Sequence, residues 1–362
     1  MNQDIRFCTT SDNVKLAYAV SGNGPPLVMP ATWLSHLEHQ WKSLAWQPWL
    51  ETLSQKYTLL RYDSRGCGLS DRNLTEFTFD GWIRDIEAVV DAAGFRQFDI
   101  LATCWGGPIG IEYAARHPDR VQRLVLYGAY ALGRLRGEQP IEAETARLLL
   151  EMTRVGWGQE SHAFCQVWGS YFQPGGTLAH FRSWSEQQTL STSAETAVRL
   201  LQVGWHTDVR AAARKIKCPT LVLHVARDTV VPIEVGRQLA TLIPDCRFVQ
   251  FDGENHMPLF DEPAWPQIVA EIDNFLKQPV EDSPPQPTLP LGKLTERERD
   301  VLDAIAQGLD NAEIAASLGM SEKTVRNHIT RVLDKIGVEH RYQAIVQARE
   351  AGLGLKGRAV TP

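Results

Sequence analysis

A proline-rich segment about three quarters of the way along the chain constrains its fold most strongly. Residues 277–290, KQPVEDSPPQPTLP, contain five prolines in fourteen residues and show no hydrophobic periodicity. Because each proline fixes φ and removes a backbone donor, this segment cannot enter a helix interior or a central strand. It is typical of an extended linker. We therefore expect two domains, 1–276 and 291–362, which agrees with the length of 362 residues.

The composition differs on the two sides of this linker. All eleven tryptophans precede it. Of the net charge of −6, residues 291–362 contribute +1, with 11 Lys and Arg against 10 Asp and Glu, and residues 1–290 contribute −7, with 26 against 33. A surface for a polyanion such as nucleic acid is therefore expected in the C-terminal domain.

Several classes of protein are unfavourable for this sequence. No apolar run approaches the roughly 20 residues that a membrane-spanning helix needs. The first residues lack an apolar signal core, so we expect a cytoplasmic protein without a membrane partner. The six cysteines show no CxxC spacing, which disfavours a disulfide framework and a zinc site. We therefore expect neither a metal nor a cofactor.

The N-terminal domain alternates short apolar runs with amphipathic helical patterns. One helical pattern is 82–93, in which Ile83, Ile86 and Val90 share a face, and another is 108–116. This alternation predicts a doubly wound α/β fold around a parallel sheet. The expected buried strands are 27–29, 58–62, 98–103, 123–127, 220–225 and 247–251.

The segment of about 131–214 interrupts this alternation. It is rich in Leu, Trp and Gln, and its pattern is mostly helical. Because it follows the carboxyl end of strand 123–127, we expect it above the edge of the sheet where α/β folds bind ligands. We therefore interpret it as a helical lid.

The turn after strand 98–103 resembles a catalytic motif. Residues 102–106 read Ala-Thr-Cys-Trp-Gly, which is similar to the G-x-S-x-G nucleophile elbow of the α/β-hydrolase fold family. Cys104 stands at the nucleophile position. The resemblance covers about 12–276 and includes residues 63–70, which match the family's D-x-R-G-x-G-x-S loop.

The same resemblance implies a catalytic triad of Cys104, Asp228 and His256. Asp228 follows strand 220–225, and His256 follows the last strand, in the order nucleophile, acid, histidine that this fold uses. His256 would take the thiol proton, Asp228 would fix the imidazole tautomer, and the thiolate would attack a carbonyl. A position at a helix N-terminus favours the thiolate form.

An oxyanion would require two backbone N–H groups, which the resemblance assigns to Thr32 and Trp105. The chain departs from the family at two places. Cys104 replaces Ser, and Pro30-Ala31 replaces the usual His-Gly at the start of the oxyanion loop. Both departures favour a slow or inactive hydrolase, or a pocket that only binds its ligand.

Aromatic residues and one histidine are candidates for the wall of a ligand pocket. Trp105 would lie beside Cys104 in the elbow. Each of the other candidates could line the pocket or, alternatively, pack in the hydrophobic core. These candidates are Trp33, His36, Trp157 and Trp184, together with Trp168 and Trp205.

The C-terminal domain carries a series of helix starts. Thr295 with Glu298, and Asp310 with Glu313, stand at capping-box spacing before apolar positions. A glycine turn then leads to a third helix capped by Ser321, and a fourth helix is expected over 340–351. Two helices joined by a short glycine turn, the second carrying basic residues, are the helix-turn-helix plan.

Residues 294–351 closely resemble the DNA-binding domain of LuxR-type regulators. Two departures are Asp310, where Ser or Thr is usual, and Ala312, where a basic residue is common. The shared residues include Leu294-Thr295, Arg297-Glu298, Val301-Leu302, Gly308, Asn311, Glu313-Ile314-Ala315, Leu318, Ser321, Lys323-Thr324-Val325, His328, Lys335 and Arg341. The resemblance predicts an all-α domain of four helices.

The third helix would contact double-stranded DNA. By resemblance, Arg326, Asn327 and Thr330 face the base edges of the major groove, where Arg reads guanine and Asn reads adenine. Lys323, Thr324 and Arg331 are assigned to phosphates. A single module reads few bases, so we expect a homodimer on paired half-sites.

We expect a transcription regulator that binds DNA and responds to a small organic ligand near Cys104. An active Cys-His-Asp hydrolase of esters, lactones or thioesters, with an attached DNA-binding domain, is the alternative. A large domain that only oligomerises is a third hypothesis. The sequence names neither the ligand nor the operator.

Overall fold

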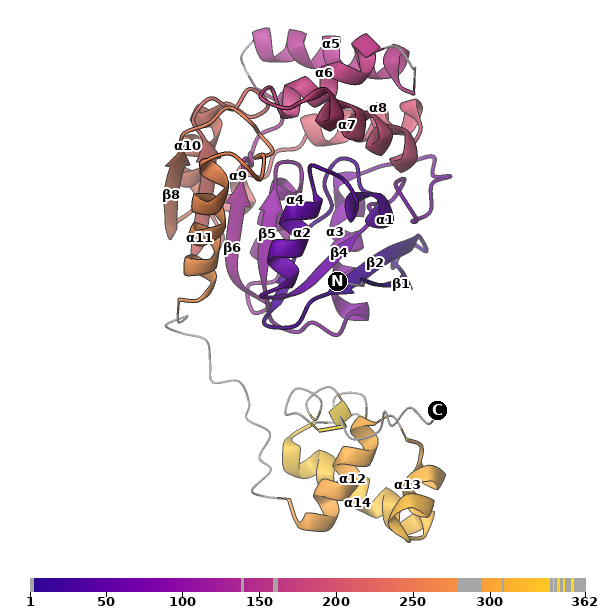
Figure 1. Ribbon diagram of the computed structural model, residues 1–362. Helices are drawn as coiled ribbons and strands as arrows, with labels where there is room; N and C mark the ends of the chain where they lie inside the picture. Colours follow the sequence, from indigo (N-terminus) through magenta and orange to yellow (C-terminus); the bar gives the residue numbers. More distant parts are fainter. Residues whose placement is uncertain are drawn as a thin grey trace. The chain divides into compact units, whose positions relative to one another are not determined.

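The computed structural model divides into two compact units, residues 1–280 and 281–362 (Figure 1). It describes residues 3–137, 140–158, 162–278, 294–307, 309–338, 341, 344–345, 348 and 353–354, without the side chains of 140–142 and 162–165. Most of the linker expected at 277–290 lies outside these residues. The exact domain boundaries stay a prediction.

An eight-stranded sheet forms the centre of the larger unit, in the order β1-β2-β4-β3-β5-β6-β7-β8. The strands β3 to β8 are parallel, whereas β2 runs antiparallel to both β1 and β4. The bounds are Asp4–Thr9 (β1), Lys15–Ser21 (β2), Pro26–Val28 (β3), Thr58–Tyr62 (β4), Phe98–Thr103 (β5), Val121–Tyr127 (β6), Thr220–Val225 (β7) and Cys246–Phe251 (β8).

The predicted fold class is confirmed, and the sheet contains one hairpin that the sequence analysis did not predict. All six expected parallel strands are present, and their ends differ from the prediction by at most two residues. The hairpin of β1 and β2 was missed. Most residues of β1 are at least partly exposed, so its sequence lacks the continuous apolar run by which the other strands were recognised.

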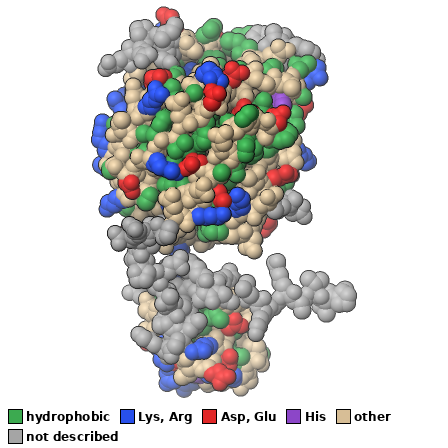
Figure 2. Space-filling model, turned by 60° about the vertical axis from the view of Figure 1, so that its left-hand side comes forward, with side chains coloured by type: hydrophobic (Ala, Val, Ile, Leu, Met, Phe, Trp, Pro, Cys, Tyr) green, Lys and Arg blue, Asp and Glu red, His purple; other side chains and the backbone are tan. Residues whose placement is uncertain are grey.

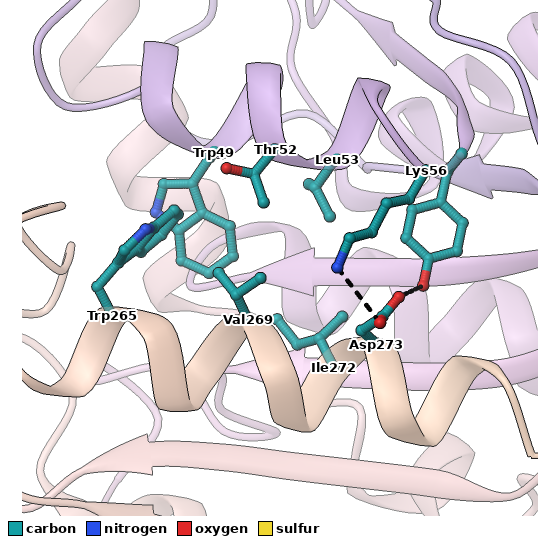
Figure 3. A pocket seen from close by; sticks show the side chains of 9 residues that line it. Trp49, Thr52, Leu53, Lys56, Trp265, Val269, Ile272 and Asp273 are labelled. Atoms are coloured by element: carbon teal, nitrogen blue, oxygen red, sulfur yellow. Dashed lines mark hydrogen bonds and ion pairs between the residues drawn. The ribbon is translucent and has the colours of Figure 1, made fainter.

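Helices cover both faces of the sheet. On one face α2 (Gln47–Ser54) packs against α11 (Ala264–Leu276), where the rings of Trp49 and Trp265 meet edge to face with centroids 4.9 Å apart (Figure 3). On the other face lie α3 (Phe79–Ala92), α4 (Gly106–Arg116), α9 (Arg210–Ala213) and α10 (Ile233–Leu242). A short helix, α1 (Leu37–Gln40), follows β3. This double layer buries the core of parallel strands.

The lid consists of helices inserted between β6 and β7. They lie over the carboxyl ends of the strands (Figure 1). Their bounds are Pro140–Gly156 (α5), His162–Phe172 (α6), Leu178–Ser191 (α7) and Ala194–Trp205 (α8), followed by α9. Their position places apolar and aromatic lid residues above the end of β5.

The smaller unit is helical, with α12 (Glu296–Ala306), α13 (Asn311–Leu318) and α14 (Glu322–Ile336). Both expected capping boxes are formed, at Thr295 with Glu298 and at Asp310 with Glu313. Gly319 closes α13 with a φ of +64°, a left-handed conformation that favours glycine. Of the expected fourth helix, 340–351, the described residues Arg341, Ala344, Ile345 and Ala348 are helical, and the others lie outside the described part.

Two searches of the described residues gave negative results. None of their helices has the length and apolar character to cross a membrane. No group of three or more His, Cys, Asp and Glu side chains among them has the arrangement of a metal site.

Candidate active site and DNA-binding helix

Cys104 occupies a sharp turn between β5 and α4. Its φ is +46°, an unfavourable value for a residue with a β-carbon, and its backbone N–H donates to the Tyr127 carbonyl at 2.8 Å. Two glycines let neighbouring chain segments approach this turn. A β-carbon on Gly106 would lie 3.0 Å from the Pro30 carbonyl oxygen, and one on Gly107 would lie 2.5 Å from the Ala129 β-carbon. The sequence Cys-Trp-Gly-Gly thus suits the elbow because small residues flank a strained position.

Asp228 and His256 form a buried hydrogen-bonded pair. His256 Nδ1 lies 2.6 Å from Asp228 Oδ2, and the residues are 1% and 6% exposed. The other carboxylate oxygen accepts from the backbone N–H groups of Val230 and Val231 at 2.8 and 3.0 Å. Burial raises the pKa of Asp228, but the adjacent His256 and these hydrogen bonds outweigh it, so the pKa is lowered. The carboxylate therefore stays ionised and orients the imidazole.

The second ring nitrogen of His256 lies toward Cys104. Burial lowers the pKa of His256, but the charges of Asp228 and Cys104 and the hydrogen bond with Asp228 outweigh it and raise the pKa well above its usual value. Nε2 is buried and has no hydrogen-bond partner among the described residues. Gly128 gives the ring room, since a β-carbon there would lie 2.7 Å from His256 Cε1. The structure thus brings Cys104, His256 and Asp228 together.

The two backbone groups assigned to the oxyanion flank the elbow. Trp105 is the N-terminal cap of α4, and Thr32 lies in the loop after β3, next to Pro30. In the described part of the chain, neither backbone N–H donates to a protein acceptor. Trp105 is buried, and its ring meets that of Trp82 with centroids 5.5 Å apart. Their role in binding an oxyanion stays a prediction.

A stack of aromatic rings covers the triad from the lid. The ring of Phe172 lies 5.6 Å from that of His256 and stacks on Trp184, with centroids 4.7 Å apart and an interplanar angle of 12°. Trp168 extends the stack, and its centroid lies 4.6 Å from that of Trp33. Trp33 also contacts Trp157, at 5.9 Å. Four of the expected pocket residues, Trp33, Trp157, Trp168 and Trp184, therefore belong to one aromatic cluster.

Sequence reasoning missed two residues of this cover, Phe172 and Gln173. Gln173 is fully buried, donates to the Met257 carbonyl and accepts from the Trp184 indole N–H, both at 2.9 Å. It thus ties the lid to the loop of His256. Their only sequence signal is their place in the lid. His36, in contrast, caps α1, where its Nδ1 accepts from the His39 backbone at 3.4 Å.

Three hollows among the described residues have walls that include neither Cys104 nor His256. One hollow lies between α2 and α11, with Trp49, Leu53 and Trp265 in its wall (Figure 3). A second lies in the lid beside Trp157, Trp168 and Gln188, and a third borders Thr32 and Arg61.

The loop of residues 63–70, which resembles D-x-R-G-x-G-x-S, has a structural role. The guanidinium of Arg65 is buried between the carboxylates of Asp12 and Asp85, at 2.8 and 2.7 Å. Gly68 lies against Asp63, because a β-carbon there would lie 2.2 Å from its carboxylate. This network fixes the segment that follows β4.

Helix α14 presents its polar face to solvent. Val325, Ile329 and Val332 are buried against α12 and α13. The six residues assigned to DNA are all exposed, and Lys323, Arg326 and Arg331 form no ion pair with any described residue. The six are Lys323, Thr324, Arg326, Asn327, Thr330 and Arg331. The visible face of the larger unit instead shows acidic and basic side chains interspersed (Figure 2).

Two long-range contacts position this helix and its neighbours. Lys335 of α14 bonds both carboxylate oxygens of Glu298, at 2.7 and 2.9 Å, and the same carboxylate caps α12. Arg341 donates to Asn311 Oδ1 at 2.6 Å. Four residues shared with the LuxR-type pattern are therefore structural.

Two family models match separate parts of the chain. The alpha/beta hydrolase fold family matches residues 25–263. The luxR family of bacterial regulatory proteins matches residues 292–348.

Similar proteins correspond to the larger unit. The chain is 28% identical over 260 residues to the pimeloyl-[acyl-carrier protein] methyl ester esterase of Nitrosomonas europaea, covering 70% of this chain and 96% of that one. It is 26% identical over 264 residues to a non-heme chloroperoxidase of Kitasatospora aureofaciens, covering 69% and 91%. Among solved structures, an esterase from a Rhodococcus species matches with a TM-score of 0.63 and 26% identity, covering 75% of this chain and 98% of that one. The chain therefore belongs to the α/β-hydrolase fold family and carries, after its hydrolase-fold part, a DNA-binding domain of the LuxR family.

Proposed function

We propose that this protein is a transcription regulator whose hydrolase-fold domain senses a small organic ester or lactone through Cys104. One observation carries the proposal: a thiol at a strained elbow faces a buried His256–Asp228 pair in a chain that also has a LuxR-type domain. The elbow and the pair supply the groups for covalent chemistry, and the second domain supplies the contact with DNA.

The covalent step follows from the positions of the triad groups. His256 accepts the Cys104 proton, and Sγ attacks the carbonyl carbon of the ligand while the π pair moves to oxygen. The N–H groups of Thr32 and Trp105 stabilise this oxyanion. Its collapse breaks the carbon–oxygen single bond, and the leaving alkoxide takes the proton from His256. The product is an acyl thioester on Cys104 and a free alcohol.

Release of the acyl group would need a second step. Water would lose a proton to His256 and attack the thioester, and the thiol would re-form as the acid leaves. The ring of Phe172 lies over His256, which is 1% exposed, and this burial limits the access of water to the imidazole. We infer that the thioester persists, so that the acylated protein is a signalling state.

The alternative is an active hydrolase with an attached DNA-binding domain. It is supported by the activity of two similar proteins, the methyl ester esterase of Nitrosomonas europaea and the esterase from Rhodococcus. Both hypotheses use the same three side chains. They differ in whether the thioester accumulates or turns over.

In this proposal, the reaction at Cys104 regulates the binding of DNA by α14. Its three unpaired cations face solvent, and a single recognition helix buries little surface. We therefore propose that a homodimer binds two half-sites. Acylation of Cys104 would change the affinity for DNA only if the acyl group stabilises one arrangement of the protein more than another.

Intact-protein mass spectrometry tests the proposal directly. The full chain is incubated with phenyl butyrate, and its mass is followed alongside phenol release. A butyryl adduct that accumulates on the wild type and is absent in Cys104→Ala supports covalent sensing. Phenol release over many turnovers without an adduct supports the hydrolase. The absence of both adduct and Cys104-dependent turnover would overturn a covalent role for Cys104.

A second experiment links the two domains. Fluorescence anisotropy measures the affinity of acylated and free protein for a duplex that the full chain selects from a random pool. The sensor hypothesis expects the two affinities to differ by about fivefold or more, the usual lower range of allosteric coupling. Equal affinities would contradict regulation by the adduct. Cys104→Ala, which has no nucleophile at this position, is the control and should bind the duplex equally with and without the acyl donor.

A further inference from the structure

Tyr130 carries a buried hydroxyl group without a partner. The residue is 8% exposed, and its hydroxyl oxygen has no hydrogen-bond partner among the described residues. Burial of a hydroxyl group without a hydrogen bond is unfavourable, so such a group in a folded protein requires an explanation. Tyr130 was not among the candidate residues of the sequence analysis.

The segment that carries Tyr130 lies between the elbow and His256. It follows β6, and a β-carbon on Gly128 would lie 2.7 Å from His256 Cε1. A β-carbon on Gly107 would lie 2.5 Å from the Ala129 β-carbon and 3.7 Å from the Tyr130 backbone nitrogen. Tyr130 is thus anchored beside the start of α4, two residues after the glycine that contacts His256.

The strand order separates Tyr130 from the oxyanion loop. β5, which ends at Cys104, lies between β3 and β6. Thr32 follows β3, and Tyr130 follows β6. The segments that contain these two residues therefore approach Cys104 from opposite sides, and the one that contains Tyr130 is on the side where Gly128 contacts His256.

The hydroxyl of Tyr130 remains a donor at neutral pH. Burial raises its pKa well above the usual value, the charge of Cys104 raises it further, and the charge of Arg134 opposes this. The coupling to Cys104 agrees with the position of the residue beside the elbow.

We propose that the Tyr130 hydroxyl donates a hydrogen bond to the leaving-group oxygen of a ligand bound at Cys104. The inference rests on the proposed acylation of Cys104. The leaving group faces His256, which protonates it, and Tyr130 lies on that side. Because sulfur is a weak acceptor, the site selects oxygen esters and lactones over thioesters.

A matched pair of acyl donors tests this selection. Phenyl butyrate and S-phenyl thiobutyrate place the same butyryl group on Cys104 and differ only in the leaving atom. The rate of adduct formation on the full chain is measured by mass spectrometry. In Tyr130→Phe, the rate with the ester is expected to fall about tenfold, and the rate with the thioester less than about twofold, as the loss of one neutral hydrogen bond implies.

Tyr113→Phe is the control. Tyr113 is also fully buried with an unpartnered hydroxyl, but it lies on α4 near Arg120 and Asp91. This variant should leave both rates unchanged. An equal fall of both rates in Tyr130→Phe, or no fall, would overturn the role of Tyr130 while acylation of the wild type still stands. Failure of the wild type to react with either donor would overturn the proposed function, and this inference with it.

Discussion

Gly204 of lid helix α8 lies directly against the indole of Trp105, the residue after Cys104. A β-carbon on Gly204 would lie 2.0 Å from Trp105 Cη2, which is far closer than real contacts permit. Trp105 is held on another side by Trp82, so its ring has little freedom to retreat. The lid is therefore in direct steric contact with the elbow, and movement of one requires a response from the other.

Gly204→Ala should disturb both the lid and the elbow. Overpacking of a tight core typically costs about 1–3 kcal/mol, and we expect the free energy of unfolding to fall within that range. Urea unfolding followed by tryptophan fluorescence measures this change, because all eleven tryptophans precede the linker. Gly137→Ala is a suitable control, since the nearest atom to a β-carbon there is 3.8 Å away. Equal stability of the two variants would contradict the contact.

The His256–Asp228 pair should make the stability of the larger unit depend on pH. The pKa of His256 is raised in the folded state by Asp228 and Cys104 against the effect of burial. A group whose pKa is raised by folding stabilises the fold fully at pH values below its pKa in the unfolded chain, about 6.5 for histidine. This stabilisation is lost as the pH rises through the pKa of the group in the folded state. Unfolding free energy should therefore decrease from pH 6.5 upward.

Asp228→Asn tests this dependence with little change in shape. The Asn side-chain oxygen can still accept from Val230 and Val231, but the negative charge beside His256 is removed. We expect lower stability at pH 6.5 and a shallower decline toward pH 9 than in the wild type, both measured by urea unfolding. Parallel pH profiles for the two proteins would rule out the pair as the cause.

The sequence was a good guide wherever a local pattern dictates structure. Strands 58–62, 98–103 and 220–225 match β4, β5 and β7 at both ends, because continuous apolar runs mark buried parallel strands. The three described helix starts of the smaller unit follow their capping residues in the same way. The elbow and its partners were located through family resemblance.

Contacts between segments that are distant in the sequence could not be predicted from any comparable local pattern. Phe172 reaches His256 only because the lid folds over the sheet, and Tyr130 becomes unpartnered only through its tertiary surroundings. Lys335 and Glu298 are 37 positions apart. Such contacts depend on how elements pack, which neither periodicity nor spacing specifies.

Substitutions on α14 should separate base contacts from phosphate contacts. Arg326→Ala is expected to weaken binding of the selected duplex by about 1–3 kcal/mol and to relax specificity at one base pair. Lys323→Ala should weaken all duplexes alike and reduce the salt dependence by about one unit of slope. Anisotropy titrations at several salt concentrations provide both quantities.

The control removes a charge from another helix of the same unit. Arg299 lies on α12 and has no assigned DNA contact, so Arg299→Ala is the control variant. It should retain the specificity and most of the affinity of the wild type. A loss equal to that of Arg326→Ala would mean that overall charge, and not the face of α14, determines binding.

The ion pair between Glu298 and Lys335 should hold α12 and α14 together. Glu298 is 3% exposed, and the hydrogen bond from Lys335, aided by the Thr295 backbone, lowers its pKa to about 2. Because the Lys335 side chain is 36% exposed, water screens the pair, and we expect each single change, Glu298→Gln or Lys335→Gln, to cost on the order of 1 kcal/mol. Hydrogen exchange of residues 296–336 in the full chain should show faster exchange in both variants. The double variant should cost less than the sum of the two, and strict additivity would show that the two side chains do not interact.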